Sequence, residues 1–121
     1  DPGLQVDAVT SEQSGMEAVA ELAARGQSYD AIFAASDLIA IGAMKALHER
    51  GLRVPTDVAI AGFDDIPMAG FVNPSLSTVQ QDTKLAGQVL VESLLQLING
   101  EAVESRTLPV KLALRRSSGA S

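Results

Sequence analysis

One stretch decides the fold of this chain: Val58-Ala59-Ile60-Ala61-Gly62-Phe63-Asp64-Asp65. It opens as a continuous apolar run, which is typical of a parallel β-strand that is covered on both faces. The run ends abruptly in two carboxylates, and Gly62 leaves room for a close approach of backbone or ligand. Because ligands of open α/β sheets bind outside the carboxyl ends of the strands, Asp64 and Asp65 stand where a small molecule is expected to bind.

Strand-like and helix-like patterns alternate on both sides of this stretch. The sequence predicts strands over residues 4–9, 29–35, 58–63, 76–81 and 107–114, and helices over residues 15–25, 38–50 and 83–98. Such alternation with short connections is typical of α/β proteins with a doubly wound parallel sheet. The polar residues from Ser117 onward are expected to form a frayed tail.

The composition narrows the classes of function. With 121 residues, no Cys and a formal net charge of −6, the sequence predicts at most one modest domain without disulfides or thiolate metal sites. An acidic chain whose only basic cluster is Arg115-Arg116 is a poor candidate for direct contact with nucleic acid. No apolar run approaches the roughly 20 residues that span a membrane. The first residues, Asp1-Pro2-Gly3, look like a cut inside a longer protein.

Motifs that carry catalysis or bind cofactors are absent from the sequence. It contains neither of the phosphate-cradling glycine loops, GxxxxGK and GxGxxG, and no GxSxG nucleophile elbow. His48 is the single His, without a second His or a paired nucleophile. We therefore predict no catalytic residue, no metal site and no cofactor, although Asp64-Asp65 superficially resembles an acidic metal-binding pair.

Several motifs occur together in a characteristic order. They are Asp30-Ala31-Ile32-Phe33-Ala34-Ala35-Ser36-Asp37, Ile41-Gly42-Ala43, Gly51-Leu52-Arg53-Val54-Pro55, Gly62-Phe63-Asp64-Asp65, and Asn73-Pro74-Ser75-Leu76-Ser77-Thr78-Val79 with Gln81. This series, from about Tyr29 to Arg116, resembles the C-terminal part of the effector-binding domain of the LacI/GalR family of transcriptional regulators, close to the lac repressor type. Each motif is weak by itself, whereas the set in this order is highly specific.

The resemblance implies the C-terminal lobe of a type I periplasmic-binding-protein-like fold, in which an effector binds between two lobes joined by crossover strands. Residues 1–78 would form most of the C-terminal lobe, residues 79–105 a crossover and a helix of the N-terminal lobe, and residues 106–121 the returning strand and tail. Helix 83–98 carries a strong apolar stripe, which would cover a sheet that this chain does not contain. We therefore expect this helix to fold back or to pack on a neighbouring copy.

The resemblance also implies three effector contacts. Asp64 matches a position that contacts effector in the family, and a carboxylate accepts strong hydrogen bonds from sugar hydroxyls. Ser36 matches a position that often carries Asn, and Gln81 lies at the proposed crossover. The plainer alternatives are a loop carboxylate that caps amides for Asp64, a helix N-cap for Ser36 and a surface strand residue for Gln81. Asp37 and Asp65 are expected to be structural.

A second set of residues is expected to form a dimer interface. The apolar residues of helix 38–50 outnumber what one sheet face needs, and the loop after Asp65 is unusually apolar. In the family that the sequence resembles, both regions contribute to the subunit interface. The alternative is that both segments cover the core of their own lobe. The predicted interface residues are Leu38, Ile41, Met44, Lys45, Met68, Phe71 and Val72.

Together these observations predict the effector-sensing and dimerisation part of a sugar-responsive transcriptional regulator in the cytoplasm. It would bind a sugar or sugar derivative, form a homodimer and contact no membrane. It would reach operator DNA only through a helix-turn-helix domain outside this chain. One alternative is a monomeric periplasmic sugar-binding protein of an ABC transporter. Another is an enzyme that uses Asp64 as an acid or as a metal ligand.

Overall fold

The computed structural model describes residues 1–120 of the chain. Its helices are α1 (Glu12–Ala24), α2 (Asp37–Glu49) and α3 (Thr83–Ile98), with short 3-10 helices η1 (Pro2–Leu4), η2 (Pro67–Gly70) and η3 (Arg116–Ser118). Its strands are β1 (Ala31–Phe33), β2 (Ala59–Asp64), β3 (Ser77–Gln81) and β4 (Val110–Ala113). The chain divides into two compact units: residues 1–80 with the segment from Leu112 onward, and Gln81–Lys111.

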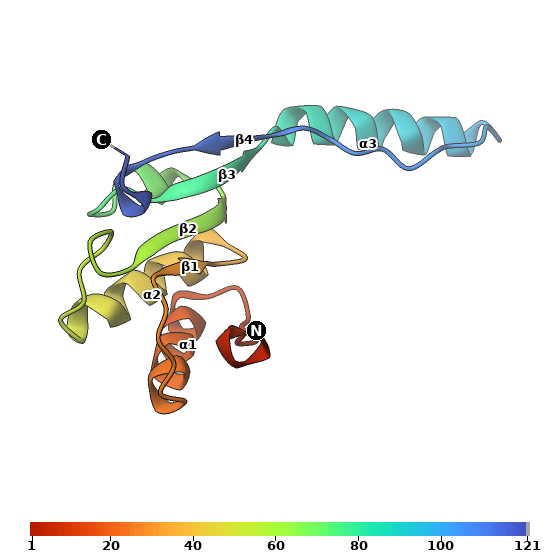
Figure 1. Cartoon of the computed structure of the whole chain (residues 1–121). Coiled ribbons are helices and arrows are strands. Elements are labelled where there is room, and N and C mark those ends of the chain that lie inside the picture. Colours follow the sequence, from red (N-terminus) through yellow and green to blue (C-terminus); the bar gives the residue numbers. More distant parts are fainter. Residues whose placement is uncertain (121) are drawn as a thin grey trace. The chain divides into compact units, whose positions relative to one another are not determined.

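The strands form a four-stranded sheet in the order β1-β2-β3-β4 (Figure 1). β2 lies parallel to both of its neighbours. Its residue Ala61 is the register partner of Phe33 in β1 and of Ser77 in β3. Parallel neighbours need a crossover connection, and α2 lies in the crossover between β1 and β2. The predicted parallel α/β sheet is confirmed, with the apolar run 58–63 in a central strand.

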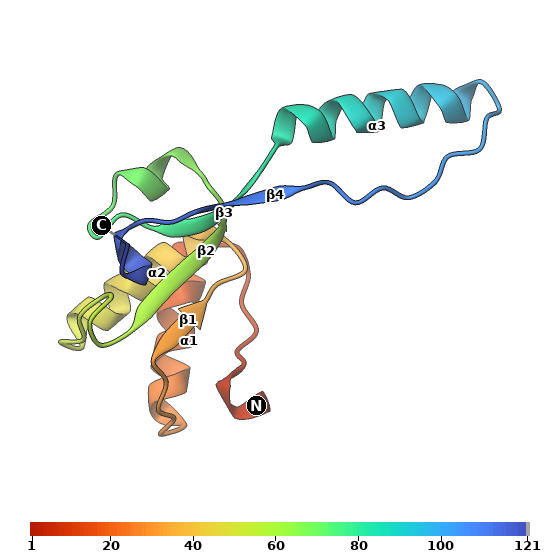
Figure 2. The same cartoon turned by 45° about the horizontal axis from the view of Figure 1, so that its top comes forward.

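Helix α2 is packed against both α1 and β2, with the two helices on the same face of the sheet (Figures 1 and 2). Glycines permit the close crossing of the helices. A Cβ on Gly15 would lie 2.0 Å from the carbonyl oxygen of Ile39, and one on Gly42 would lie 1.8 Å from that of Glu12. Part of the apolar surplus on α2 is therefore covered by α1, while a contact of its remaining apolar residues with another subunit stays a prediction.

The first predicted strand, over residues 4–9, is not formed. The chain starts with η1, and residues 5–9 pair with no strand. Side chains of α1 and its C-cap satisfy this backbone instead. Arg25 donates to the carbonyl oxygens of Gly3 and Gln5, and the Ser14 hydroxyl oxygen accepts from the N–H of Val9. A segment whose polar backbone groups are bonded to a helix does not need a strand partner.

The expectation of a frayed tail from Ser117 onward is also wrong. Ser117 is fully buried, and its hydroxyl donates to the carbonyl oxygen of Ile60 at 2.6 Å and accepts from the N–H of Ser77 at 2.8 Å. The Ser77 hydroxyl accepts from the N–H of Arg115 at 2.7 Å. The polar residues that made the tail look solvated thus serve to attach it to β2 and β3.

The second unit contains α3, whose start matches the sequence prediction. Asp82 caps it by accepting the N–H of Leu85 at 2.9 Å. None of the residues of α3 is buried, and Leu90 and Ile98 are each 70% exposed. What covers the apolar stripe of α3, whether the helix folds back or packs on a second copy, stays a prediction.

Candidate functional site

The carboxyl edge of the sheet brings polar residues from neighbouring strands to one level. Phe33, Ala61 and Ser77 are register partners across β1, β2 and β3. Three residues further along each strand direction lie Ser36, Asp64 and Gln80, and Asp64 and Gln80 are themselves register partners. The register therefore places two of the polar residues at the predicted ligand-facing edge, Ser36 and Asp64, at the same level of the sheet.

Asp64 is exposed and has a backbone conformation that L-amino acids rarely adopt. Its φ is 119°, and that of Asp65 is 59°; they are the positive-φ residues other than glycine among residues 1–120. Such conformations cost on the order of 1–3 kcal/mol each and persist only where surrounding contacts enforce them. Because strained backbone of this kind gathers at ligand-binding sites, the turn with the two aspartates is a candidate ligand site.

Asp65 faces protein partners, which confirms the structural role expected for it. Its carboxylate forms an ion pair with Arg115 at 2.8 Å and accepts a hydrogen bond from the Gln80 side-chain amide at 3.0 Å. Arg115 also donates to the carbonyl oxygen of Leu76 at 2.9 Å. The turn that contains Asp64 is thus attached both to β3 and to the segment after β4.

Asp37 has the structural role expected for it, and it connects parts of the fold that lie far apart in the sequence. It is fully buried, yet its carboxylate accepts from the Thr78 hydroxyl at 2.6 Å and from the N–H of Ile66 at 2.8 Å. The Thr78 hydroxyl oxygen also accepts from the N–H of Asp65 at 3.3 Å. Sequence reasoning missed this network and the role of Arg115. The one local signal was a carboxylate directly after a residue that already serves as N-cap.

Ser36 serves as the N-cap of α2. Its hydroxyl oxygen accepts from the N–H of Ile39 at 3.3 Å, and the residue is 5% exposed. The plainer alternative is therefore observed, and a contact between Ser36 and an effector stays a prediction. Gln81 is the exposed last residue of β3, directly after Gln80, and it begins the second unit. Its contact with an effector is likewise a prediction.

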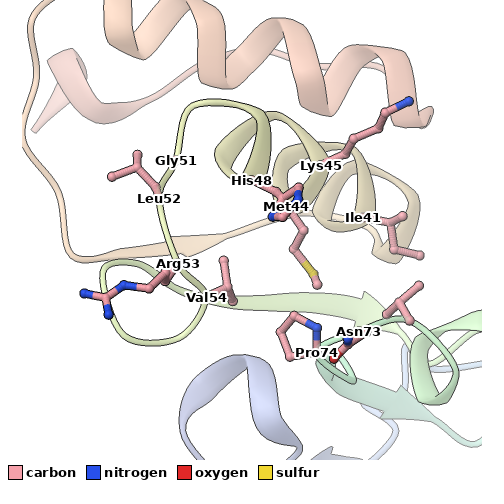
Figure 3. A pocket seen from close by; sticks show the side chains of 11 residues that line it. Ile41, Met44, Lys45, His48, Gly51, Leu52, Arg53, Val54, Asn73 and Pro74 are labelled. Carbon is pink, nitrogen blue, oxygen red and sulfur yellow. The ribbon is translucent and has the colours of Figure 1, made fainter.

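A surface pocket of about 640 Å³ lies elsewhere in the first unit, next to the predicted dimer residues (Figure 3). Its lining includes Ile41, Met44, Lys45 and Val72, and Met44 points toward the Asn73–Pro74 segment. None of the three predicted effector contacts is among the described residues that line it. The pocket is therefore a feature of the predicted interface region and is separate from the carboxyl edge.

The predicted interface residues differ in how accessible they are. Met44 is 7% exposed and belongs to the core, so it offers little surface to a partner. Phe71 is 88% exposed and Met68 47% exposed. Of the remaining predicted residues, Lys45 is exposed, and three are half-buried: Leu38, Ile41 and Val72. The available apolar surface is thus centred on the loop after β2.

An exposed ion pair closes the turn that leads into β2. Arg53 Nε lies 3.1 Å from Asp57 Oδ2, and Asp57 also accepts from the backbone N–H of Arg53 at 2.7 Å. These hydrogen bonds lower the pKa of the Asp57 carboxyl below its usual value and raise that of Arg53. Because the pair is solvated, its contribution to stability is small.

Residues 1–120 contain no group of three or more His, Asp or Glu side chains placed to hold a metal ion. Within the same range, no helix is both long enough and apolar enough to cross a membrane.

The family model of the periplasmic binding protein-like domain matches residues 3–118. By sequence, the chain is 42% identical over 101 residues to the HTH-type transcriptional regulator CelR of Thermobifida fusca, and 38% identical over 109 residues to the lactose operon repressor of Escherichia coli. These alignments cover 84% and 89% of this chain, but 28% and 30% of the two relatives. The chain thus spans less than a third of the length of either relative.

Solved structures of proteins with these names have the same fold. The transcriptional regulator CelR in complex with cellobiose matches 98% of this chain and 37% of its own, with a TM-score of 0.89 and 37% identity. The lac repressor dimer bound to operator and the anti-inducer ONPF matches 93% of this chain and 40% of its own, with a TM-score of 0.86 and 38% identity.

Proposed function

Because this chain belongs to the LacI family of transcriptional regulators and carries its periplasmic binding protein-like domain, we propose that it is the C-terminal, effector-sensing part of a sugar-responsive repressor. CelR is described in complex with cellobiose, and other relatives are named for the lactose operon and the ribose operon. A sugar is therefore the effector class that the relatives support. Their names as regulator and repressor favour this function over transport by a periplasmic binding protein.

The observation that carries the proposal is the strained, exposed Asp64 at the carboxyl edge of the sheet. A carboxylate in this position can accept two hydrogen bonds from adjacent sugar hydroxyls, and such charge-assisted bonds are stronger than neutral ones. A strained turn that is held in place before ligand arrives loses little conformational entropy on binding. Asp64 therefore has both the chemistry and the preorganisation of a sugar contact.

In this proposal the chain senses the sugar and breaks no bond. Residues 1–78 form most of one lobe, residues 79–105 a crossover and a helix of the other lobe, and residues 106–121 the returning strand and tail. The sugar shifts the equilibrium between two lobe arrangements by binding one of them more tightly. A helix-turn-helix domain outside this chain contacts operator DNA, and the protein acts in the cytoplasm as a homodimer.

The loop after β2 is the proposed centre of the dimer interface. Phe71 and Met68 are exposed apolar side chains, and Val72, Ile41 and Lys45 line the neighbouring pocket. The lac repressor structure that this chain resembles is a dimer. An exposed aromatic side chain next to an apolar pocket supports a symmetric contact in which each copy offers both parts.

The test of sugar sensing compares Asp64→Asn with the wild type in the full-length regulator. Asn keeps the size of Asp and tolerates positive φ, but it removes the charge. We expect cellobiose, lactose or ribose to raise the melting temperature of the wild type, and Asp64→Asn to weaken that binding by about tenfold or more. The measurements are a thermal-shift screen and calorimetric titration.

Asp30→Asn is the matched control, because Asp30 is an exposed carboxylate immediately before β1, at the opposite end of the sheet. It should bind the sugar as the wild type does. A wild type that binds none of the three sugars, or an Asp64→Asn variant with unchanged affinity, would overturn the proposal.

A further inference from the structure

We propose that Asp37 is a positioning residue that holds the strained Asp64 turn in its binding geometry. The inference rests on the proposed function, because it takes Asp64 to be the residue that contacts the sugar. Asp37 itself is 0% exposed at the start of α2, so it acts through other residues and does not touch a ligand. We call Asp37, Thr78 and the N–H groups of Asp65 and Ile66 the Asp37 bracket.

The Asp37 bracket fixes the backbone that follows Asp64. Ile66 donates directly to Asp37, and Asp65 donates to the Thr78 hydroxyl, which itself donates to Asp37. The two peptide N–H groups after Asp64 are therefore both attached to one carboxylate. A residue at a φ of 119° relaxes unless its neighbours hold it, so these two bonds provide the restraint that the strained turn requires.

The Asp37 carboxylate lies close against β2, where only a glycine leaves enough space for it. A Cβ on Gly62 would lie 2.3 Å from Asp37 Oδ1, so any other residue at this position would displace the carboxylate. Gly62 lies two residues before Asp64 in the same strand. The sequence suggested that Gly62 leaves room for a ligand. In the structure, the Asp37 carboxylate takes up the space beside Gly62.

The bonds of Asp37 also separate this role from ordinary helix capping. Ser36 already caps α2 through the N–H of Ile39. Both described hydrogen bonds of the Asp37 carboxylate go to other elements, one to β3 and one to the turn after β2. A buried charge is tolerated here because it accepts two hydrogen bonds and lies at the positive end of the α2 dipole. The Asp37 carboxylate thus connects the start of α2 to β3 and to the turn after β2.

The experiment uses a pair of Thr78 variants in the full-length regulator. Thr78→Val removes the hydroxyl and nearly preserves the shape of this buried side chain, whereas Thr78→Ser keeps the hydroxyl and removes a methyl group. In calorimetric titrations with cellobiose, lactose and ribose, we expect Thr78→Val to weaken binding by about tenfold or more. Thr78→Ser should retain most of the affinity, because the hydrogen bonds and not the methyl group position Asp64.

Variants of Asp37 separate positioning from direct contact. In Asp37→Asn the amide oxygen can still accept from Ile66, and the amide nitrogen can donate to Thr78. It should therefore retain sugar binding, whereas Asp37→Ala should lose it. A direct charge contact with the sugar would give the opposite result, with Asp37→Asn as damaging as Asp37→Ala.

Amide hydrogen exchange measured without sugar provides a readout independent of the ligand. Thr78→Val should speed exchange at the N–H groups of Asp65 and Ile66, with Thr78→Ser and the remote control Asp57→Asn close to the wild type. If the wild type binds none of the sugars while this exchange pattern is seen, the proposed function fails and the bracket stands. Equal exchange and equal affinity in Thr78→Val and Thr78→Ser would overturn the positioning role.

Discussion

At the scale of single residues, two adjacent carboxylates acquire different roles from their surroundings. Asp65 is bonded to Arg115 and Gln80, whereas Asp64 is exposed at the sheet edge on a strained backbone. Both residues have positive φ values, so neither continues the extended backbone of the strand. The chemistry of the pair is thus decided by which partners each carboxylate meets.

The ion pair between Arg115 and Asp65 provides a test at this scale. We expect Arg115→Gln to lower the free energy of unfolding by about 1–2 kcal/mol, because it leaves the partly buried Asp65 without its cation. Urea denaturation of the wild type and the variant measures this difference. In the control Arg53→Gln, the lost pair is solvated and little should change. Equal loss in both variants would contradict a special role for Arg115.

At the scale of secondary-structure elements, the crossing of α1 and α2 sets where the core lies. Because glycines allow backbone contact there, α1 packs closely against α2 and covers part of its apolar surface. The sequence displayed the apolar surplus of α2, yet it did not reveal which element would cover it. An amphipathic pattern indicates that a face is buried and leaves its partner open.

Replacement of the crossing glycine is expected to reverse the usual effect of Gly→Ala in a helix. Alanine normally stabilises a helix interior by about 0.5–1 kcal/mol. In Gly42→Ala the new methyl group would meet the backbone of Glu12, so we expect a loss of about 1–3 kcal/mol in urea denaturation. Gly87→Ala, in α3 with open space around it, should show the ordinary gain in the 121-residue chain. A gain in Gly42→Ala would show that the helices can separate freely.

At the scale of the whole molecule, the proposed function requires assembly with parts outside this chain. The apolar stripe of α3 and the loop around Phe71 both expose surface that a monomeric lobe has no need for. Exposed apolar patches of this kind mark sites of association. We assign the first to the second lobe of the regulator and the second to the partner subunit.

Phe71 is expected to be a main contact of the homodimer. Because it is 88% exposed, Phe71→Ser should leave the fold intact while it weakens dimerisation of the full-length regulator by about tenfold or more. Analytical ultracentrifugation measures the monomer–dimer equilibrium. Phe33→Ser removes another exposed aromatic, on β1 and outside the predicted interface, and should leave the dimer unchanged. Loss of dimer in the Phe33 variant alone would place the interface elsewhere.

Some features could be predicted because they have a local signature. The apolar run before Asp64 identified a parallel strand, and the residues at its end identified the edge where polar groups gather. The caps at Ser11, Ser36 and Asp82 could be recognised from residue type and position. The weak alternation over residues 4–9 and the polar residues of the tail led to wrong predictions. In both segments, serine or arginine side chains form hydrogen bonds with the backbone, and hydrophobic periodicity does not indicate such bonds.

By itself, the sequence determined the order of the helices and of the strands from β1 to β4, and it indicated the candidate ligand-facing edge and the family. These follow from periodicity, from caps and from motifs that are each contained in a few consecutive residues. Only the tertiary structure decided that Asp37 lies beneath the Asp64 turn, because its bonds join residues 29 and 41 positions apart. Contacts across such separations leave no local pattern in the chain, and they exist only once the sheet and α2 have packed together.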